Sequence, residues 1–233
     1  MGELKIIYHD EHYIAVDKPA GVLVHRTRIS EDTRFVLQQL RDQIGQRVYP
    51  VHRLDRPTSG VLVFGLDSDA ARRLVGLFEK RMVSKRYLAV VRGYISEGSR
   101  IDYPLQEEDG RLPQQAVTEY RRLATVELPF AVGRYATARY SLVEVLPETG
   151  RMHQIRKHMK HIFHPIVGDT THGDGKHNQL FRDQFGIYRL LLMATDLGFI
   201  HPYLGVQVSL QSRLDEELEQ LFDRFGWGSE CLN

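Results

Sequence analysis

Short β-rich apolar runs, several of them with alternating polar positions, recur along this chain. They predict strands over residues 5–8, 13–16, 61–64, 86–92 and 139–145. A turn at residues 9–12 would join the first two. The strands are not strictly interleaved with helices, and this favours an α+β fold with a mainly antiparallel sheet.

Apolar residues at helical spacing predict four helices, over residues 32–44, 68–78, 154–161 and 214–225. Ser30 or Asp32 would supply the N-cap of the first helix. The polar stretch 96–115 carries prolines and glycines and is predicted to be a loop-like insertion.

Length and composition predict one soluble globular domain over residues 1–233, either undivided or with a modest subdivision. The chain has 42% hydrophobic and 26% charged residues, which is ordinary for that class. No apolar run reaches about 18 residues, so we expect no membrane span. The single cysteine, Cys231, cannot form an internal disulfide, and with no leader pattern at the start this indicates a reduced, cytoplasmic setting.

Charge is distributed unevenly although the formal net charge is only +1. Residues 72–92 contain seven lysines and arginines against one acid, and residues 151–164 contain four, with four histidines and no acid. The segment 214–225 is acidic instead. A basic face of this kind predicts an RNA partner, and the alternative is a set of solvated helix faces.

The segment 52–63 places Asp55 between Arg53 and Arg56, on a turn that leads into the apolar run 61–64. Such a loop at the mouth of a sheet is where catalytic groups commonly lie. Two nearby guanidiniums would keep the Asp55 carboxylate ionised and would attract an anionic ligand. A surface turn with weak ion pairs is the alternative that the local chemistry leaves open.

This segment resembles the signature motif of the RluA-type pseudouridine synthases. Further blocks that resemble the family follow in its order, at residues 17–25, 85–93, 149–158, 164–169 and 192–202. The resemblance therefore covers nearly the whole chain. It implies the pseudouridine synthase catalytic fold, a long, mainly antiparallel mixed sheet with a central cleft, without the S4 domain of larger relatives.

The resemblance also implies an activity, the isomerisation of uridine in RNA with no cofactor and no metal. Asp55 matches the catalytic aspartate, Tyr87 the tyrosine that stacks on the flipped uracil, and Arg156 the arginine that pairs with the aspartate. Arg53 matches the residue that inserts into the RNA. The other residues expected to bind or line the RNA path are Arg56, Lys18, Arg151, His153 and Gln154, and Ile155 and Leu192 would form an apolar wall.

Finer segments at residues 42–46, 52–60, 123–127, 133–135 and 225–227 resemble the branch of the family that modifies uridine 65 of tRNA. A tRNA substrate is therefore expected, and a monomer, with 23S ribosomal RNA as the alternative substrate. A non-catalytic RNA-binding module is the alternative from another functional class. The histidines at positions 153–177 have no spacing typical of a zinc site, so metal binding is not expected.

Overall fold

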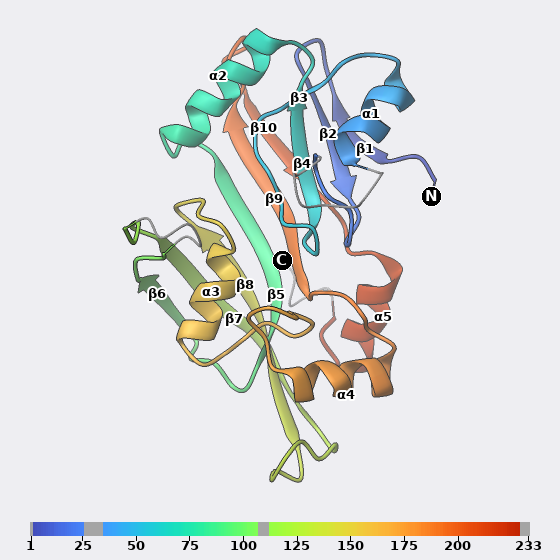
Figure 1. Cartoon of the computed structure of the whole chain (residues 1–233), viewed down its shortest axis with the longest axis vertical. Coiled ribbons are helices and arrows are strands. Elements are labelled where there is room, and N and C mark those ends of the chain that lie inside the picture. The colour runs from blue at the N-terminus through green and yellow to red at the C-terminus, as the bar shows by residue number, and fades with distance from the viewer. Residues whose placement is uncertain (1, 26–34, 107–111, 229–233) are drawn as a thin grey trace. The chain divides into compact units, whose positions relative to one another are not determined.

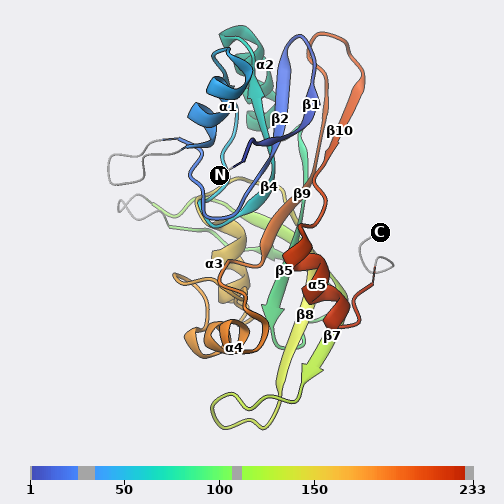
Figure 2. The ribbon, with the colours of Figure 1, turned by 90° about the vertical axis from the view of Figure 1, so that its right-hand side faces the viewer.

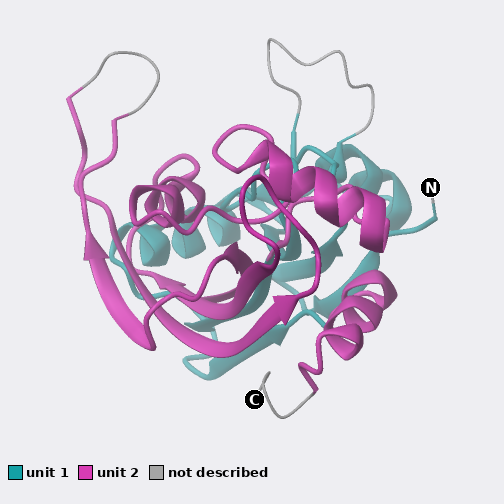
Figure 3. Ribbon diagram, turned by 90° about the horizontal axis from the view of Figure 1, so that it is seen from below, with its two compact units in different colours: residues 1–85, 193–213 teal, residues 86–192, 214–233 magenta. Residues whose placement is uncertain are grey.

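The computed structural model describes residues 2–25, 35–106 and 112–228 (Figure 1). The chain forms two compact units (Figure 3). Unit 1 comprises residues 1–85 and 193–213, and unit 2 comprises residues 86–192 and 214–233. The chain thus passes from one unit to the other at three points.

Unit 1 is built on strands that are antiparallel except at one pairing. Its strands follow the order β1-β2-β4-β9, with β10 beside β9 and β3 beside β4. Their bounds are β1 (Lys5–His9), β2 (Tyr13–Lys18), β3 (Tyr49–Pro50), β4 (Ser59–Gly65), β9 (Leu192–Ile200) and β10 (Gln207–Gln211). The pairing of β4 with β9 is parallel and joins Ser59 to Met193 and Gly60 to Ala194. Every residue of β4 is buried, so this is an interior strand.

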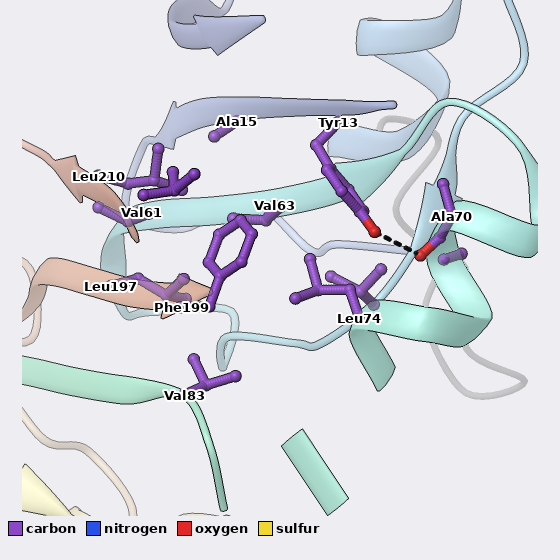
Figure 4. Close-up of a cluster of buried hydrophobic side chains, with 13 residues drawn as sticks. Tyr13, Ala15, Val61, Val63, Ala70, Leu74, Val83, Leu197, Phe199 and Leu210 are labelled. Carbon is purple, nitrogen blue, oxygen red and sulfur yellow. Dashed lines mark hydrogen bonds between the residues drawn. The ribbon is translucent and has the colours of Figure 1, made fainter. Parts of the chain in front are cut away.

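Two helices belong to unit 1, α1 (Val36–Ile44) and α2 (Ser68–Glu79). Asp67 begins α2 as its N-cap, because its carboxylate accepts a hydrogen bond from the backbone N–H of Ala70. Apolar residues of β4, β9 and α2 form one buried cluster, in which the Tyr13 hydroxyl donates to the carbonyl of Ala70 (Figure 4). This cluster fixes β4 against the helix.

The start of α1 corrects one prediction. The helix begins at Val36 with Phe35 at the N-cap position, and Phe35 has no side-chain oxygen to cap it. Ser30 and Asp32, the predicted caps, lie outside the described residues.

Unit 2 is built on four antiparallel strands in the order β5-β8-β7-β6. They are β5 (Ser84–Arg92), β6 (Gly98–Asp102), β7 (Val117–Leu128) and β8 (Ala138–Pro147). Strands β7 and β8 run side by side as a long hairpin whose tip extends beyond α4 and α5 (Figure 2). Strand β6 lies inside the stretch predicted as a loop, so that prediction was wrong for residues 98–102.

The helices of unit 2 are α3 (Gln154–His161), α4 (Gly175–Phe185) and α5 (Glu216–Arg224). Ile155 and Met159 of α3 join a buried cluster with residues of β5 and β8, including Ala89 and Val143. This contact fixes α3 on one face of the strands.

The α+β class and the mainly antiparallel pairing are confirmed. The single domain over residues 1–233 and the central cleft stay predictions. Among the described residues, no helix has both the length and the apolar character needed to cross a membrane.

Candidate active site

Asp55 lies on the loop between β3 and β4, where its side chain is partly buried. The loop is anchored on either side of it. Leu54 is buried, and the backbone N–H of Thr58 donates to the carbonyl of Asp55 over 3.1 Å. Val61 and Val63, directly downstream, lie in the unit 1 core (Figure 4). The carboxylate is therefore carried by a short segment held in the core at both ends.

Gly60 explains why the motif needs a glycine at the start of β4. Its φ is +111°, and a Cβ there would lie 2.0 Å from the carbonyl oxygen of Ala194. Any side chain would collide with the backbone of β9, because β4 and β9 meet at this position. The glycine thus lets the Asp55 loop approach β9.

Lys18 is fully buried and fixes the backbone that follows Asp55. Its ammonium donates to the carbonyls of Pro19, over 2.9 Å, and Arg56, over 3.1 Å. The N–H of Gly21 donates to the same Arg56 carbonyl, and the Nε of Arg56 donates back to the carbonyl of Gly21. Two segments far apart in the chain, residues 18–21 and 55–58, are therefore joined into one polar structure. Lys18 belongs to this support.

His52 also has a structural contact. Its Nε2 accepts a hydrogen bond from the backbone N–H of Val63 over 3.1 Å, so the ring proton is on Nδ1. The ring stacks on Phe78. Burial, with a contribution from the nearby Lys85 ammonium, lowers the pKa of His52 to about 3. The ring is neutral and holds the start of the motif against β4.

Tyr87 is in β5, opposite Val145 of β8. Its ring is partly buried at the margin of the unit 2 core, in which Ile155 and Leu192 are both buried. Ile155 and Leu192 thus belong to one cluster, against which Tyr87 packs, and their role as an apolar wall stays a prediction. The residue is partly exposed.

Arg156 forms a buried ion pair with Asp169. The guanidinium meets the carboxylate through two bonds, Nε to Oδ2 at 2.7 Å and Nη2 to Oδ1 at 2.8 Å. The side chains are 4% and 1% exposed. Burial raises the pKa of Asp169, but the bonds from Arg156 and from the N–H groups of Thr171 and His172 outweigh it and lower the pKa overall. Arg156 is therefore held in one orientation.

The turn around Asp169 is itself closely packed. The amide of Asn178 donates to the carbonyl of Asp169 and its oxygen accepts from the N–H of Gly168. A Cβ at Gly173 would lie 2.1 Å from the Asp169 carbonyl oxygen. Asp169 lies in a segment, residues 164–169, that resembles the family, but no spacing rule in the sequence connects it to Arg156.

His153 has a left-handed backbone with φ of +56° at the N-cap of α3. Its Nδ1 lies 3.0 Å from Nε2 of His172, whose backbone N–H donates to Asp169. A non-glycine residue in this conformation indicates local strain. His153 and Arg156 are thus linked through the 169–172 turn.

Gln154 and Arg151 differ in how far their side chains are exposed to solvent. Gln154 is buried, its amide donates to Val117 and Thr118, and its oxygen accepts from Thr149 and Arg151. Both the nitrogen and the oxygen of its side-chain amide therefore bond to other parts of the protein. Arg151 is partly buried, and its Nε donates to the carbonyl of Gln115.

The histidines singled out in the sequence make separate contacts. His158 is fully buried, with Nδ1 2.8 Å from Oγ1 of Thr118 and Nε2 3.0 Å from the carbonyl of Tyr103. His161 stacks on Tyr103. Within residues 2–25, 35–106 and 112–228, no three potential metal ligands of the His, Cys, Asp and Glu types gather.

Much of the basic charge predicted to form an RNA-binding face is paired with acids. The pairs are Arg72 and Arg73 with Asp69, Arg86 with Glu144, and Arg92 with Asp174. Asp69 lies just outside the segment counted in the sequence, and Glu144 and Asp174 lie far from it. Arg53 and Arg56 are exposed on the Asp55 loop.

Lys85 is a further titratable group beside the motif. Burial, followed by the neighbouring charge of Arg81, lowers the pKa of its ammonium to about 8. The sequence gives no signal for this shift.

Known proteins resemble this chain over most of its length. Residues 12–161 match the family model described as RNA pseudouridylate synthase. The chain is 50% identical over 241 residues to tRNA pseudouridine synthase C of Vibrio parahaemolyticus, covering 99% of this chain and 98% of that protein. It is 52% identical over 240 residues to the protein of that name from Vibrio cholerae, covering 98% of each.

Solved structures show the same architecture. Human RNA Pseudouridylate Synthase Domain Containing 1 is 26% identical, with a TM-score of 0.69 over 97% of this chain and 96% of that chain. Human RNA Pseudouridylate Synthase Domain Containing 4 is 24% identical, with a TM-score of 0.73 over 95% and 93%. The second of these likenesses supports the fold alone.

Proposed function

The chain belongs to the RNA pseudouridylate synthase family, and on that premise we propose that it converts uridine 65 of tRNA to pseudouridine with Asp55 as the catalytic carboxylate. The observation that carries the residue assignment is the support of the Asp55 loop. Leu54 is buried, Lys18 donates to the carbonyl of Arg56, and Gly60 lets the backbones of β4 and β9 come close together. These three contacts hold the loop at the start of the buried strand β4. The tRNA substrate rests on the names of relatives that match nearly the full chain.

The reaction breaks the bond from N1 of uracil to C1′ of ribose and forms a bond from C5 to C1′. The proton on C5 is lost and N1 gains one, so the product is an isomer of the substrate. A carboxylate near C1′ is required. Asp55 attacks the sugar, attacks the base or removes the 2′ proton, and these three routes are alternatives.

The target uridine must leave its stack, at a cost of a few kcal/mol. Arg53 is exposed beside Asp55, and a planar guanidinium stacks well in the place of a base. Tyr87 would receive the flipped uracil, since its ring borders the apolar cluster that includes Ile155 and Leu192. Arg53 would offset the cost of flipping by filling the vacated place in the stack, and Tyr87 would offset it by stacking on the flipped base.

Arg156 is assigned to orient and keep ionised the carboxylate of Asp55. What supports this role is the fixed position of its guanidinium in the bidentate pair with Asp169. A guanidinium can bind two carboxylates because it has five N–H donors. Asp169 would then act as a positioning residue for Arg156.

Arg56, Arg151 and His153 are assigned to the RNA path, since each is at least partly accessible. Lys18 and Gln154 are assigned to support instead. Both are buried and donate to the backbone, Lys18 to Pro19 and Arg56, and Gln154 to Val117.

The test is pseudouridine mapping by carbodiimide-blocked primer extension on tRNA and ribosomal RNA incubated with the protein. Wild type should give one new stop at position 65 of tRNA. Asp55→Asn should abolish it and retain RNA binding, because the amide keeps the shape and loses the charge. Asp42→Asn is the matched control, since Asp42 is exposed and pairs only with its neighbour Arg41 among the contacts described.

Each other outcome contradicts a defined part of the proposal. A stop only in ribosomal RNA would retain the enzyme class and exclude the tRNA assignment. A stop that survives in Asp55→Asn would exclude Asp55 as the catalytic carboxylate. No stop in either RNA would favour the non-catalytic binding module.

A further inference from the structure

We propose that the tip of the β7–β8 hairpin, residues 129–138, is a second RNA-contacting site that binds the substrate tRNA through Arg134 and Tyr135. This rests on the proposed function, because it assumes a tRNA substrate. It concerns affinity for the RNA and involves none of the groups assigned to the reaction.

The tip has a formed backbone. Val132 and Tyr135 exchange two backbone hydrogen bonds, of 3.0 and 3.2 Å, around Gly133, whose φ is +62°. Strands β7 and β8 are paired from Thr118 with Pro147 to Leu128 with Ala138, directly below the tip. A preformed turn loses little conformational entropy when it binds.

A series of aromatic contacts, which starts at Phe130, holds the hairpin where its tip begins. Phe130 meets Phe185 of α4, Phe185 meets Phe225, and Phe225 meets Trp227, with ring centroids 5.0–6.0 Å apart. The indole N–H of Trp227 donates to the carbonyl of Thr125 in β7. The hairpin is thereby braced by α4 and by the segment that follows α5, and it extends past both helices (Figure 2).

The exposed chemistry of the tip suits RNA. The guanidinium of Arg134 lies 5.1 Å from the ring centroid of Tyr135, and its Nη2 donates to the Tyr135 hydroxyl. Tyr135 is 61% exposed. A stacked arginine keeps further N–H donors for phosphate, and an exposed tyrosine offers a surface on which a base stacks.

The surrounding charge favours the same ligand. Residues 129–138 contain no acid, and the ammonium of Lys176 comes within 3.8 Å of the position that a Cβ on Gly133 would occupy. A second pair of the same kind lies further along the hairpin, where Arg139 covers Tyr94. Glu127 accepts hydrogen bonds from Tyr94 and Thr137 and pairs with Arg139, so this second pair is largely neutralised and the tip carries the free charge.

Three segments noted in the sequence meet in this region. Residues 123–127 lie in β7, residues 133–135 lie within the tip, and Phe225 and Trp227 belong to the aromatic series. Each of the three segments resembles the tRNA-modifying branch of the family, and the third lies about 90 residues after the second in the sequence. The structure places all three on one hairpin and its brace.

The experiment measures the affinity of the full-length protein for unmodified tRNA together with steady-state kinetics. Arg134→Ala combined with Tyr135→Ala should weaken binding about 10-fold, raise KM by a similar factor, and change kcat less than about 2-fold. Loss of one phosphate contact should also lower the slope of log K against log salt by about 1. Tyr135→Phe keeps the stacking surface and should bind like wild type.

Arg100→Ala is the matched control, because Arg100 is an exposed arginine surrounded by Asp102, Glu119 and Glu148. It should leave affinity unchanged. The melting temperature of the double variant should equal that of wild type, since both side chains are exposed.

Double-variant affinity within about 2-fold of wild type would overturn the proposal, as would a fall in kcat with unchanged affinity. A wild-type protein that forms no pseudouridine in tRNA would instead overturn the proposed function. The two failures are therefore distinguishable.

Discussion

Arg156 and Asp169 are each buried, and the stability of such a pair depends on both charges being present. Asp169→Asn keeps the size of the side chain but leaves a buried guanidinium without its carboxylate. We expect the free energy of unfolding to fall by about 3–5 kcal/mol. Urea unfolding at pH 7 measures this change.

The control for that substitution is Asp102→Asn. Asp102 pairs with Arg100 over 3.1 Å, but both side chains are about half exposed, so we expect a loss of at most about 1 kcal/mol. Equal losses in the two variants would show that burial does not distinguish these ion pairs.

His52 gives the stability of the protein a defined dependence on pH. Its folded pKa, about 3, lies below the value near 6.5 of the unfolded chain, so the unfolded state binds the proton more readily. The stabilisation is complete above pH 6.5 and is lost as pH falls towards 3. Between pH 7 and pH 5 the contribution should fall by about 2 kcal/mol.

The contribution is isolated by comparison with His52→Gln, which cannot titrate, because other buried histidines such as His158 also have lowered pKa values. The stability difference between wild type and variant should shrink on acidification. A difference that stays constant from pH 7 to pH 5 would show that His52 is not held neutral.

At the scale of elements, the start of β4 depends on a close backbone approach. Gly60→Ala would place a methyl group 2.0 Å from the Ala194 carbonyl oxygen at a φ of +111°. We expect a loss of about 3 kcal/mol or more in unfolding free energy, with reduced activity, because the Asp55 loop would shift. Denaturant unfolding and the pseudouridine assay measure the two effects.

Gly76→Ala is the opposite case within α2 and serves as its control. A Cβ at Gly76 meets nothing within 4 Å, and alanine favours a helix over glycine by about 0.5–1 kcal/mol. The variant should be more stable than wild type with unchanged activity. If both substitutions destabilise alike, steric contact with β9 is not the reason for Gly60.

Elements with a clear apolar period could be predicted from the sequence. Helix α2 was expected over residues 68–78 and ends at Glu79, and the strand at 61–64 is the centre of β4. Helix α4 was not predicted, because an aspartate between two glycines is typical of a turn. In the structure Asp174 is instead the N-cap and accepts from the N–H of Lys176. Strand β7 was missed because much of it alternates with exposed charged residues such as Glu119 and Arg121.

Some residues of the candidate site could be predicted from the sequence, whereas the contacts that hold them could not. Asp55, Tyr87 and Arg156 were identified by local motif, which depends on a few adjacent residues. The bonds of Lys18 to the Arg56 carbonyl and of Arg156 to Asp169 depend on how distant segments meet. Only packing decides these contacts, so no local pattern could indicate them.

At the scale of the whole molecule, the affinity for tRNA should depend on salt. Phosphate contacts release counterions, and affinity should fall at least about 10-fold between 50 and 200 mM salt. Arg56→Ala, at a residue assigned to the RNA path, should reduce the slope by about 1, whereas Arg100→Ala should not, because its charge is already paired. Filter binding across a salt series measures both slopes, and a flat response would exclude a phosphate-binding surface.

The interleaved sequence of the two units sets a time for folding during synthesis. Strands β1, β2 and β4 leave the ribosome early, but β9 and β10 of unit 1 follow only after residues 86–192 have been made. At about 5–20 residues per second, that interval lasts about 5–20 s. Until then Ser59 and Gly60 lack their partners Met193 and Ala194, and the edge of β4 is open to other chains. A chaperone would therefore be most useful to the newly made protein during this interval, which ends when β9 pairs with β4.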